Sequence, residues 1–291
     1  MYKCCNLKRF FYLLILDAIV ISFLSMSFFV GRAFLSSAES AQDDSVKLPV
    51  IMYHSICEKT PSDYMVTPQQ LESDLCWLKD HGYNSVKAEE VIAFTKNQGM
   101  LPENPVMITL DDGFYNNLSF LVPLLEKYDM TAVVSIVGSY TDNNAVHDPH
   151  NSDYSYLTWE DIQTMHESDR IEFGNHTYDM HSLHGSRTGC GMNDDETEEY
   201  YRDALTADIL TLQNKFREND IPAPIIFTYP FGRVSRESVP VIRGNGFLMT
   251  LTCRELPNII THDPDCLYGI GRYNRSGLTS TEAFMEKVFS D

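Results

Sequence analysis

Two adjacent aspartates, Asp111 and Asp112, directly follow an apolar run at residues 106–110 and precede Gly113. Side chains alternate between the faces of a strand, so neighbouring carboxylates serve one site only where a strand ends and the backbone turns. Gly113 permits such a turn because it has no side chain to restrict the backbone. Carboxylates this close raise the pKa of one of them unless a cation is near. The pair indicates either a metal site with one ligand and one base, or an acidic turn.

Two histidines five residues apart, His176 and His181, follow a second strand-like stretch at residues 171–175. Five residues span about 140° around a helix, so the two rings do not share a helical face. They can converge if His176 ends a strand and His181 lies in the loop beyond it. Two imidazoles and a carboxylate are a common ligand set for a catalytic metal ion. In a chain that also has Asp111 and Asp112, the histidines favour a metal site over unrelated surface residues.

Three segments in this order resemble the first three motifs of the polysaccharide deacetylase family, the NodB-homology domain of carbohydrate esterase family 4. They are Thr109-Leu110-Asp111-Asp112-Gly113, His176-Thr177-Tyr178-Asp179-Met180-His181 and Tyr229-Pro230-Phe231-Gly232. The histidine spacing and the segment Met52-Tyr53-His54-Ser55-Ile56 are similar to the branch that contains biofilm poly-N-acetylglucosamine deacetylases. The resemblance implies a metal-dependent hydrolase of non-peptide carbon–nitrogen bonds that de-N-acetylates N-acetylglucosamine units of a surface or cell-wall polysaccharide. The alternatives are a glycan O-acetyl esterase and an inactive glycan-binding relative.

The resemblance also implies roles for individual residues. Asp112, His176 and His181 would hold one divalent ion, with zinc the first expectation and cobalt, nickel or manganese the others. Asp111 would be the general base that takes a proton from water. His54 would protonate the leaving amine, the alternative being a structural histidine.

The resemblance implies that Tyr229, Phe231 and Arg272 contact the oxyanion or the substrate, and a backbone N–H of the turn containing Tyr229 and Phe231 would stabilise the oxyanion. Two departures from the family pattern are visible. Many members have Arg where Thr228 stands, and we expect Arg272, near a later strand end, to replace it beside the catalytic aspartate. The family's fourth and fifth motifs have no convincing match after Gly232.

The N-terminus predicts a membrane anchor. Residues 10–30 carry a single charge, Asp17, and are long enough to span a bilayer as a helix. The basic residues before this stretch predict a cytoplasmic N-terminus and an extracytoplasmic domain. A signal peptide cleaved near Ser37-Ala38 is the alternative. We therefore expect a cytoplasmic tip and anchor at residues 1–32, a linker at 33–47 and a catalytic domain at 48–291.

Charge and cysteine content limit the partners. Removing the four basic and one acidic residues of positions 1–32 from totals of 22 and 41 leaves 18 and 40, a formal charge of −22. Such a charge excludes nucleic acid as the expected partner, because phosphate binding needs the opposite sign. It is compatible with a polysaccharide or oligosaccharide substrate, and we expect a monomer. The five cysteines after the anchor are scattered and predict neither a disulfide framework nor a cysteine zinc site.

Apolar runs alternate with helical patterns along the rest of the chain, which predicts parallel strands joined by helices. In such folds ligands bind at the C-terminal ends of the strands, where all three motifs fall. The resemblance narrows this to an α/β fold, a distorted partial (β/α)7-type barrel. We expect an open groove with tyrosines for sugar stacking. Expected strands cover 49–53, 106–110, 132–137, 171–175, 225–229 and 247–252, and expected helices 68–80, 88–97, 116–128, 158–167, 195–218 and 235–244.

Overall fold

The computed structural model describes residues 45–144, 148–183 and 187–290, together with isolated positions between residues 11 and 27. The chain divides into two units, Met1–Asp44 and Ser45–Asp291. Among the described residues, no helix combines the length and the apolar character needed to cross a bilayer. Twelve of the 21 residues of the anchor predicted over residues 10–30 lie outside the described residues, and the anchor stays a prediction. The second unit already includes β1 (Val46–Lys47), so ordered structure begins within the predicted linker.

A parallel sheet forms the centre of the second unit, with the strand order β12-β10-β9-β8-β7-β6-β2-β13 and β5 beside β6. All of its pairings are parallel, which confirms the predicted α/β class. Two short pairs lie outside it, β1 with β11 (Ile259–Ile260) and β3 (Ser55–Ile56) with β4 (Met65–Val66). The strands of the sheet are β2 (Val50–Tyr53), β5 (Asn84–Ser85), β6 (Pro105–Leu110), β7 (Ala132–Ile136), β8 (Ile171–Asn175), β9 (Ile226–Thr228), β10 (Met249–Leu251), β12 (Tyr268–Ile270) and β13 (Tyr273–Asn274).

The sheet curves back on itself. Its two terminal strands, β12 and β13, are separated in the sequence only by Gly271 and Arg272. One short stretch of chain therefore pairs with β10 at one end of the strand order and with β2 at the other. The result is the distorted barrel that the family resemblance implied, although neither β12 nor β13 was predicted.

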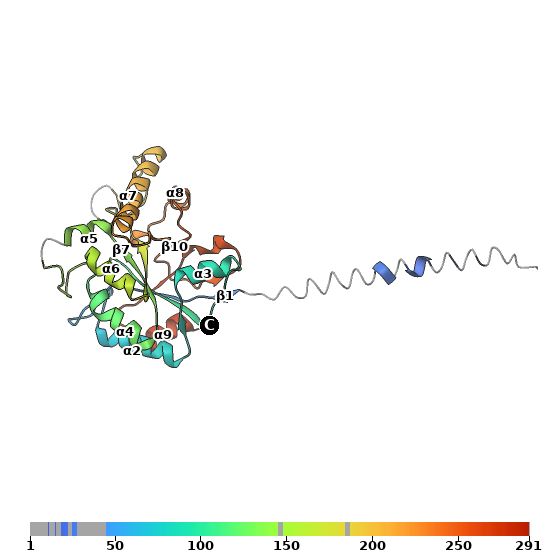
Figure 1. Ribbon diagram of the computed structural model, residues 1–291, viewed down its shortest axis with the longest axis horizontal. Helices are drawn as coiled ribbons and strands as arrows, with labels where there is room; N and C mark the ends of the chain where they lie inside the picture. Colours follow the sequence, from blue (N-terminus) through green and yellow to red (C-terminus); the bar gives the residue numbers. More distant parts are fainter. Residues whose placement is uncertain are drawn as a thin grey trace, which may run out of the picture. The chain divides into compact units, whose positions relative to one another are not determined.

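Helices surround the strands (Figure 1), with α2, α4 and α9 gathered on one side and α7 and α8 on another. The predicted helices occur with ends shifted by a few residues, whereas α5 and α9 were not predicted. The helical segments are α2 (Pro68–Asp80), α3 (Ala88–Thr95), the π-helix η1 (Asn117–Leu121), α4 (Val122–Tyr128), α5 (Gly138–Asn144), α6 (Trp159–Glu167), α7 (Glu198–Glu218), the 3-10 turn η2 (Pro230–Gly232), α8 (Ser238–Gly244), the 3-10 turn η3 (Pro264–Leu267) and α9 (Thr281–Phe289).

Both faces of the sheet are buried, as expected for parallel strands covered by helices. Val50, Met107 and Met249 belong to one apolar cluster that also includes side chains of α3. Ile51 and Ile108 point to the opposite face and pack in a second cluster with side chains of α2, α4 and α6. This alternation explains why the strands read as continuous apolar runs in the sequence.

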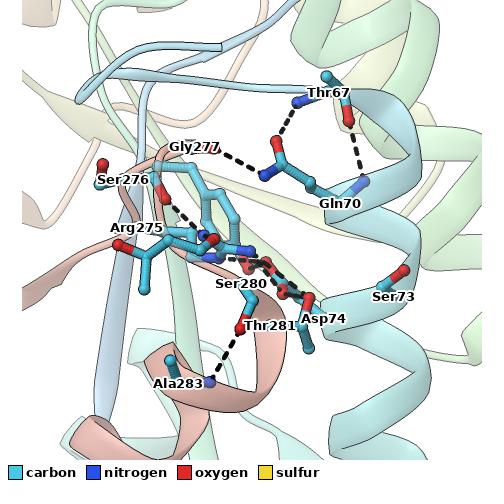
Figure 2. Close-up of polar contacts among 12 residues, drawn as sticks. Thr67, Gln70, Ser73, Asp74, Arg275, Ser276, Gly277, Ser280, Thr281 and Ala283 are labelled. Atoms are coloured by element: carbon cyan, nitrogen blue, oxygen red, sulfur yellow. Dashed lines mark hydrogen bonds and ion pairs between the residues drawn. The ribbon is translucent and has the colours of Figure 1, made fainter.

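The closing strand β13 is fixed by a buried polar network (Figure 2). Arg275, directly after β13, makes a two-point ion pair with Asp74 of α2, with Nε–Oδ2 and Nη2–Oδ1 distances of 2.7 and 3.1 Å. Thr281 of α9 and Tyr53 of β2 donate hydrogen bonds to the same carboxylate. The network joins α2, α9 and two strands, and all four side chains are buried.

The start of α2 is held to the same region. Thr67 accepts a hydrogen bond from the Gln70 N–H, and the Gln70 side chain accepts one from the Thr67 N–H, which completes a capping box. The side-chain nitrogen Nε2 of Gln70 donates to the carbonyl oxygen of Gly277 at 2.8 Å. The cap therefore also ties α2 to the segment between β13 and α9.

Candidate active site

The motif residues converge on a pocket at the C-terminal ends of the strands. The pocket has a volume of about 530 Å³. Asp111 and Asp112 reach it from the end of β6, His176 and His181 from the end of β8, and His54 from the end of β2. Parallel pairing places these ends at one edge of the barrel, because β2, β6, β7 and β8 are successive neighbours.

Left-handed backbone conformations occur at three strand ends that carry the motifs, those of β6, β8 and β9. Asp112, Thr177 and Phe231 have φ values of 72°, 72° and 56°, in the left-handed region that side chains disfavour. Each follows a motif residue at the end of β6, β8 or β9. Gly113 also has φ 72°, and a Cβ there would lie 2.9 Å from Cγ2 of Ile136. Such strain persists where the surrounding structure fixes it, typically at functional sites.

Asp112, His176 and His181 form a group that could hold a metal ion. One ligand atom from each lies within 4.8 Å of the others. Oδ1 of Asp112 is 3.7 Å from Nε2 of His176 and 3.3 Å from Nε2 of His181. Within the described residues this is the group of three or more potential ligands that meets this geometry.

Hydrogen bonds set the tautomer of each histidine. Nδ1 of His176 lies 2.7 Å from the carbonyl oxygen of Thr228, which only accepts, so Nδ1 carries the proton and Nε2 is free. Nδ1 of His181 lies 3.2 Å from the Tyr140 hydroxyl, which donates to the backbone carbonyl of His181. That arrangement favours a proton on Nδ1 and a free Nε2. Neither of these contacts could be predicted from the sequence, because both depend on the folded chain.

Arg272 holds Asp111 from inside the barrel. Its Nη1 and Nη2 lie 2.7 Å from Oδ1 and Oδ2 of Asp111, and its Nε donates to the Thr252 carbonyl. The Arg272 side chain is wholly buried and does not line the pocket. Arg272 therefore lies beside Asp111, as expected for a replacement of the family's arginine at position 228. A direct contact of Arg272 with substrate is not supported, because it does not line the pocket.

The two adjacent aspartates have opposite electrostatic environments. Burial acts to raise the pKa of Asp111, but the positive charge of Arg272 and the nearby His176 hold this pKa well below its ordinary value. Burial and the negative charge of Asp111 raise the pKa of Asp112 to about 7. Burial also lowers the pKa of His181 to about 3, with a further contribution from His176. The triad thus presents neutral nitrogen donors and a carboxylate whose charge a cation would stabilise.

His54 lies in the same pocket with an unsatisfied ring nitrogen. Its Nδ1 is buried and has no hydrogen-bond partner among the described residues. Burial lowers the His54 pKa to about 4, so the ring is neutral at neutral pH. The side chain of Asn117, in the first turn of η1, donates to the His54 carbonyl oxygen at 3.1 Å. Asn117 was not identified from the sequence, although π-helical turns often accompany functional sites.

The turn after β9 offers one backbone donor. The Tyr229 N–H donates to the Leu251 carbonyl and the Gly232 N–H to the Tyr229 carbonyl, while Pro230 has no N–H. The Phe231 N–H has no backbone acceptor among the described residues. The Phe231 ring lines the pocket and lies 4.5 Å from the His181 ring. The Tyr229 side chain instead packs in an apolar cluster and accepts a hydrogen bond from Ser238. The expected substrate contact of Tyr229 is therefore wrong for its side chain, which faces away from the pocket.

Comparison with known proteins identifies the family. The family model described as polysaccharide deacetylase matches residues 98–249. YxkH of Bacillus subtilis (strain 168) is 26% identical over 249 residues, which cover 86% of this chain and 78% of that protein. The poly-β-1,6-N-acetyl-D-glucosamine N-deacetylase of Staphylococcus epidermidis is 23% identical over 246 residues, covering 80% of this chain and 78% of its own length.

Solved structures share the fold. A de-N-acetylase from Aggregatibacter actinomycetemcomitans superposes with a TM-score of 0.69 and 22% identity, covering 82% of this chain and all of that one. IcaB from Ammonifex degensii superposes with a TM-score of 0.68 and 19% identity, covering 83% and 97% of the two chains. The superpositions show the shared fold, and the family match over more than half of the sequence shows that this chain belongs to the polysaccharide deacetylase family.

Proposed function

We propose that this protein is a metal-dependent hydrolase that removes the N-acetyl groups of N-acetylglucosamine units in a cell-surface or cell-wall polysaccharide. The observation that carries the proposal is the convergence of Asp112, His176 and His181 beside Asp111 in one pocket. The name of the S. epidermidis relative supports the same substrate class, and that of the superposed de-N-acetylase supports the same reaction.

The three triad residues fit a divalent cation. Both histidines can present an unprotonated Nε2, and a bound cation would offset the burial and repulsion that raise the pKa of Asp112. Two imidazoles and one carboxylate suit zinc best, and cobalt, nickel or manganese next. When bound, such an ion acts as a Lewis acid that polarises the amide carbonyl and acidifies water.

Asp111 accepts the proton of the attacking water in this mechanism. Its two oxygens each make one contact with Arg272, and each retains a further lone pair for another donor. The low pKa keeps this carboxylate ionised at neutral pH, and the bidentate pair fixes its orientation. Arg272 is therefore a positioning residue for the base.

The remaining steps use His54 and the η2 turn. As the water oxygen bonds to the carbonyl carbon, negative charge develops on the amide oxygen, and the Phe231 N–H is the backbone group available to stabilise it. The carbon–nitrogen bond then breaks to give acetate and an amine. His54 begins this cycle neutral, receives the proton from the water by way of Asp111, and donates it to the leaving nitrogen.

An open, partly aromatic pocket supports a polymeric substrate. Tyr64, Phe114 and Phe231 line it together with apolar side chains, and aromatic rings stack on the apolar faces of sugars. Remote contacts of this kind position the scissile amide, so turnover should rise from the monosaccharide to oligomers of four or more units. Equal kcat/KM values for the monomer and a pentamer would contradict a polymer groove.

The proposed location is outside the cell, attached through the N-terminal segment. Support comes from the sequence alone: an apolar stretch at residues 10–30 preceded by basic residues. The full-length chain should fractionate with membranes, and protease added to intact cells should digest the domain. A soluble form that begins near Glu39 would show cleavage instead.

The test of function is incubation of the purified domain with N-acetylglucosamine oligomers and with acetyl esters, each with and without chelator. We expect acetate and free amine from the oligomers, and loss of both with chelator. Acetate from esters alone would favour O-acetyl ester hydrolysis. No product from either substrate, with metal present, would favour an inactive glycan-binding relative.

A further inference from the structure

A second cavity runs along the outer side of β10. It has a volume of about 550 Å³ and is bounded by the η2 turn, α8, β10 and β12. Thr250 and Thr252 face it from β10 and the residue just beyond, at positions where neighbouring strands carry apolar side chains packed under helices. Three arginines and one aspartate supply its charged groups: Arg233, Arg243, Arg254 and Asp265. We call this cavity the arginine groove.

A single stretch of backbone separates the arginine groove from the catalytic pocket. After β10 the side chains alternate, with Thr252 and Arg254 lining the groove and Cys253 and Glu255 lining the pocket. The η2 turn divides in the same way, because Phe231 lines the pocket and Gly232 lines the groove. A polymer that crosses this rim can occupy both cavities.

Arg243 is held in place within the groove. Its guanidinium lies 3.7 Å from the centre of the Tyr268 ring and its Nη1 is 2.7 Å from Oδ1 of Asp265. The ring contact and the ion pair restrict its rotamers, so less entropy is lost when the guanidinium binds a ligand. Asp265 pairs with Arg243 and with neither Arg233 nor Arg254.

Arg233 and Arg254 have no carboxylate within 4.0 Å among the described residues. This is unusual in a chain with a net charge of −19, and Arg217 is the other described arginine without such a partner. Arginines elsewhere pair with acidic residues, for example Arg170 with Asp129 and Arg187 with Glu196. The groove thus collects unneutralised positive charge on an acidic protein.

We propose that the arginine groove binds an anionic group, a phosphate or a carboxylate, carried by the polymer whose N-acetyl group occupies the catalytic pocket. The inference rests on the proposed function and narrows its substrate to a glycan with anionic substituents. Guanidinium groups match the planar geometry of both anions and bind them with charge-assisted hydrogen bonds. The net negative charge of the domain repels polyanions at long range. Salt screens that repulsion beyond about 8 Å, so one anionic substituent of the polymer can still bind next to the arginines.

The kinetic test compares three N-acetylglucosamine tetramers: a neutral one, one with a terminal phosphate and one with a terminal carboxylate. We expect a roughly tenfold higher kcat/KM for a charged tetramer, the size of one charge-assisted hydrogen bond. The double variant Arg233→Gln/Arg254→Gln should lose this preference and keep the neutral rate. Arg236→Gln, a matched control whose side chain is 95% exposed, should retain it. Comparison of the two charged tetramers identifies the anion.

The proposal would be overturned if the unsubstituted protein had the same kcat/KM for neutral and charged tetramers. It would also be overturned if the double variant lost kcat/KM equally on both kinds of tetramer. If no tetramer is deacetylated, the proposed function fails, and inorganic phosphate tests the groove directly. Phosphate at constant ionic strength should then raise the Tm of the unsubstituted protein and of Arg236→Gln more than that of the double variant. An equal rise in all three proteins would refute anion binding in the groove.

Discussion

At the scale of single residues, neighbouring carboxylates are given different tasks by their surroundings. Asp111 makes a bidentate ion pair with Arg272, which keeps its charge despite burial. Asp112 makes no such ion pair, and burial together with the negative charge of Asp111 raises its pKa to about 7. Asp111 stays ionised in a fixed orientation, which suits a general base. Asp112 lacks a counter-charge, which suits a ligand of a metal cation.

The first prediction separates these roles. Asp111→Asn should retain the metal and lose most turnover, because the amide cannot accept a proton. Asp112→Asn should lose metal, because it removes the ligand charge, and His176→Ala should do the same. Elemental analysis and deacetylation rates of the purified variants measure both properties. Release of metal by Asp111→Asn alone would reverse the assignment of the pair.

The second prediction concerns Arg272. Arg272→Lys keeps the charge but cannot contact both oxygens of Asp111 in a planar arrangement, so kcat/KM should fall roughly 10–100-fold. Metal content should be unchanged, since Arg272 contacts no ligand of the triad. Arg170→Lys, on a surface pair with Asp129, is the control and should have ordinary activity. A wild-type rate for Arg272→Lys would show that one-point contact is sufficient.

At the scale of elements, the short strand β13 closes the barrel, and an arginine fixes it on each side. Arg272 precedes β13 and reaches Asp111 in the barrel, while Arg275 follows it and reaches Asp74 of α2. Because β13 has two residues, it makes few backbone hydrogen bonds to β2. The buried ion pairs therefore supply much of what holds β13 against β2, and through it the orientation of the base.

The third prediction tests the outer of these pairs. Asp74→Asn leaves Arg275 buried without a counter-charge and should cost about 3–5 kcal/mol of unfolding free energy. Glu198→Gln, which breaks the exposed pair with Arg202, should cost at most about 0.5 kcal/mol. Urea denaturation of both variants gives these values. The double variant Asp74→Leu/Arg275→Met should recover most of the loss, and a cost below about 1 kcal/mol for Asp74→Asn would contradict the role assigned to the pair.

At the scale of the whole molecule, the acidic charge makes stability depend on pH. Burial raises the pKa of Glu172 to about 7 and that of Asp208 to about 6. Each carboxyl binds its proton more tightly in the folded chain than in the unfolded one. Their contribution to stability is complete below the unfolded pKa and is lost as pH rises through the folded value.

The fourth prediction follows from this sign. Between pH 5 and 8 the Glu172 carboxyl should lower the free energy of unfolding by about 2–3 kcal/mol, and Glu172→Gln should remove this contribution, because the amide does not titrate. The amide oxygen can still accept the hydrogen bond from the Ala88 N–H at the start of α3. Glu199→Gln, exposed on α7, makes the same charge change and should leave the slope unaltered. Parallel curves for the two variants would exclude Glu172 as a source of the pH dependence.

The parts of the site that depend on local pattern could be predicted from the amino-acid sequence. Continuous apolar runs predict buried parallel strands, and polar residues at their ends predict a site at the C-terminal edge. Asp111, Asp112, His176 and His181 were located in this way. The predicted start of the helix at residue 68 is confirmed, and the structure shows that Thr67, Pro68 and Gln70 cap it within four residues.

The family resemblance pointed to Arg272 beside Asp111, but how distant residues complete the site depends on the tertiary fold. Arg272 meets Asp111 across 161 positions, and it does so because β12 and β13 close the barrel between them. Strands of two or three residues carry no usable periodicity, so this closure left no signal in the chain. Tertiary packing likewise brings the Asn117 side chain to the His54 carbonyl oxygen and places the Tyr229 side chain in an apolar cluster away from the pocket. Local preferences fix where a strand ends, whereas the packing of the whole barrel fixes what that end faces.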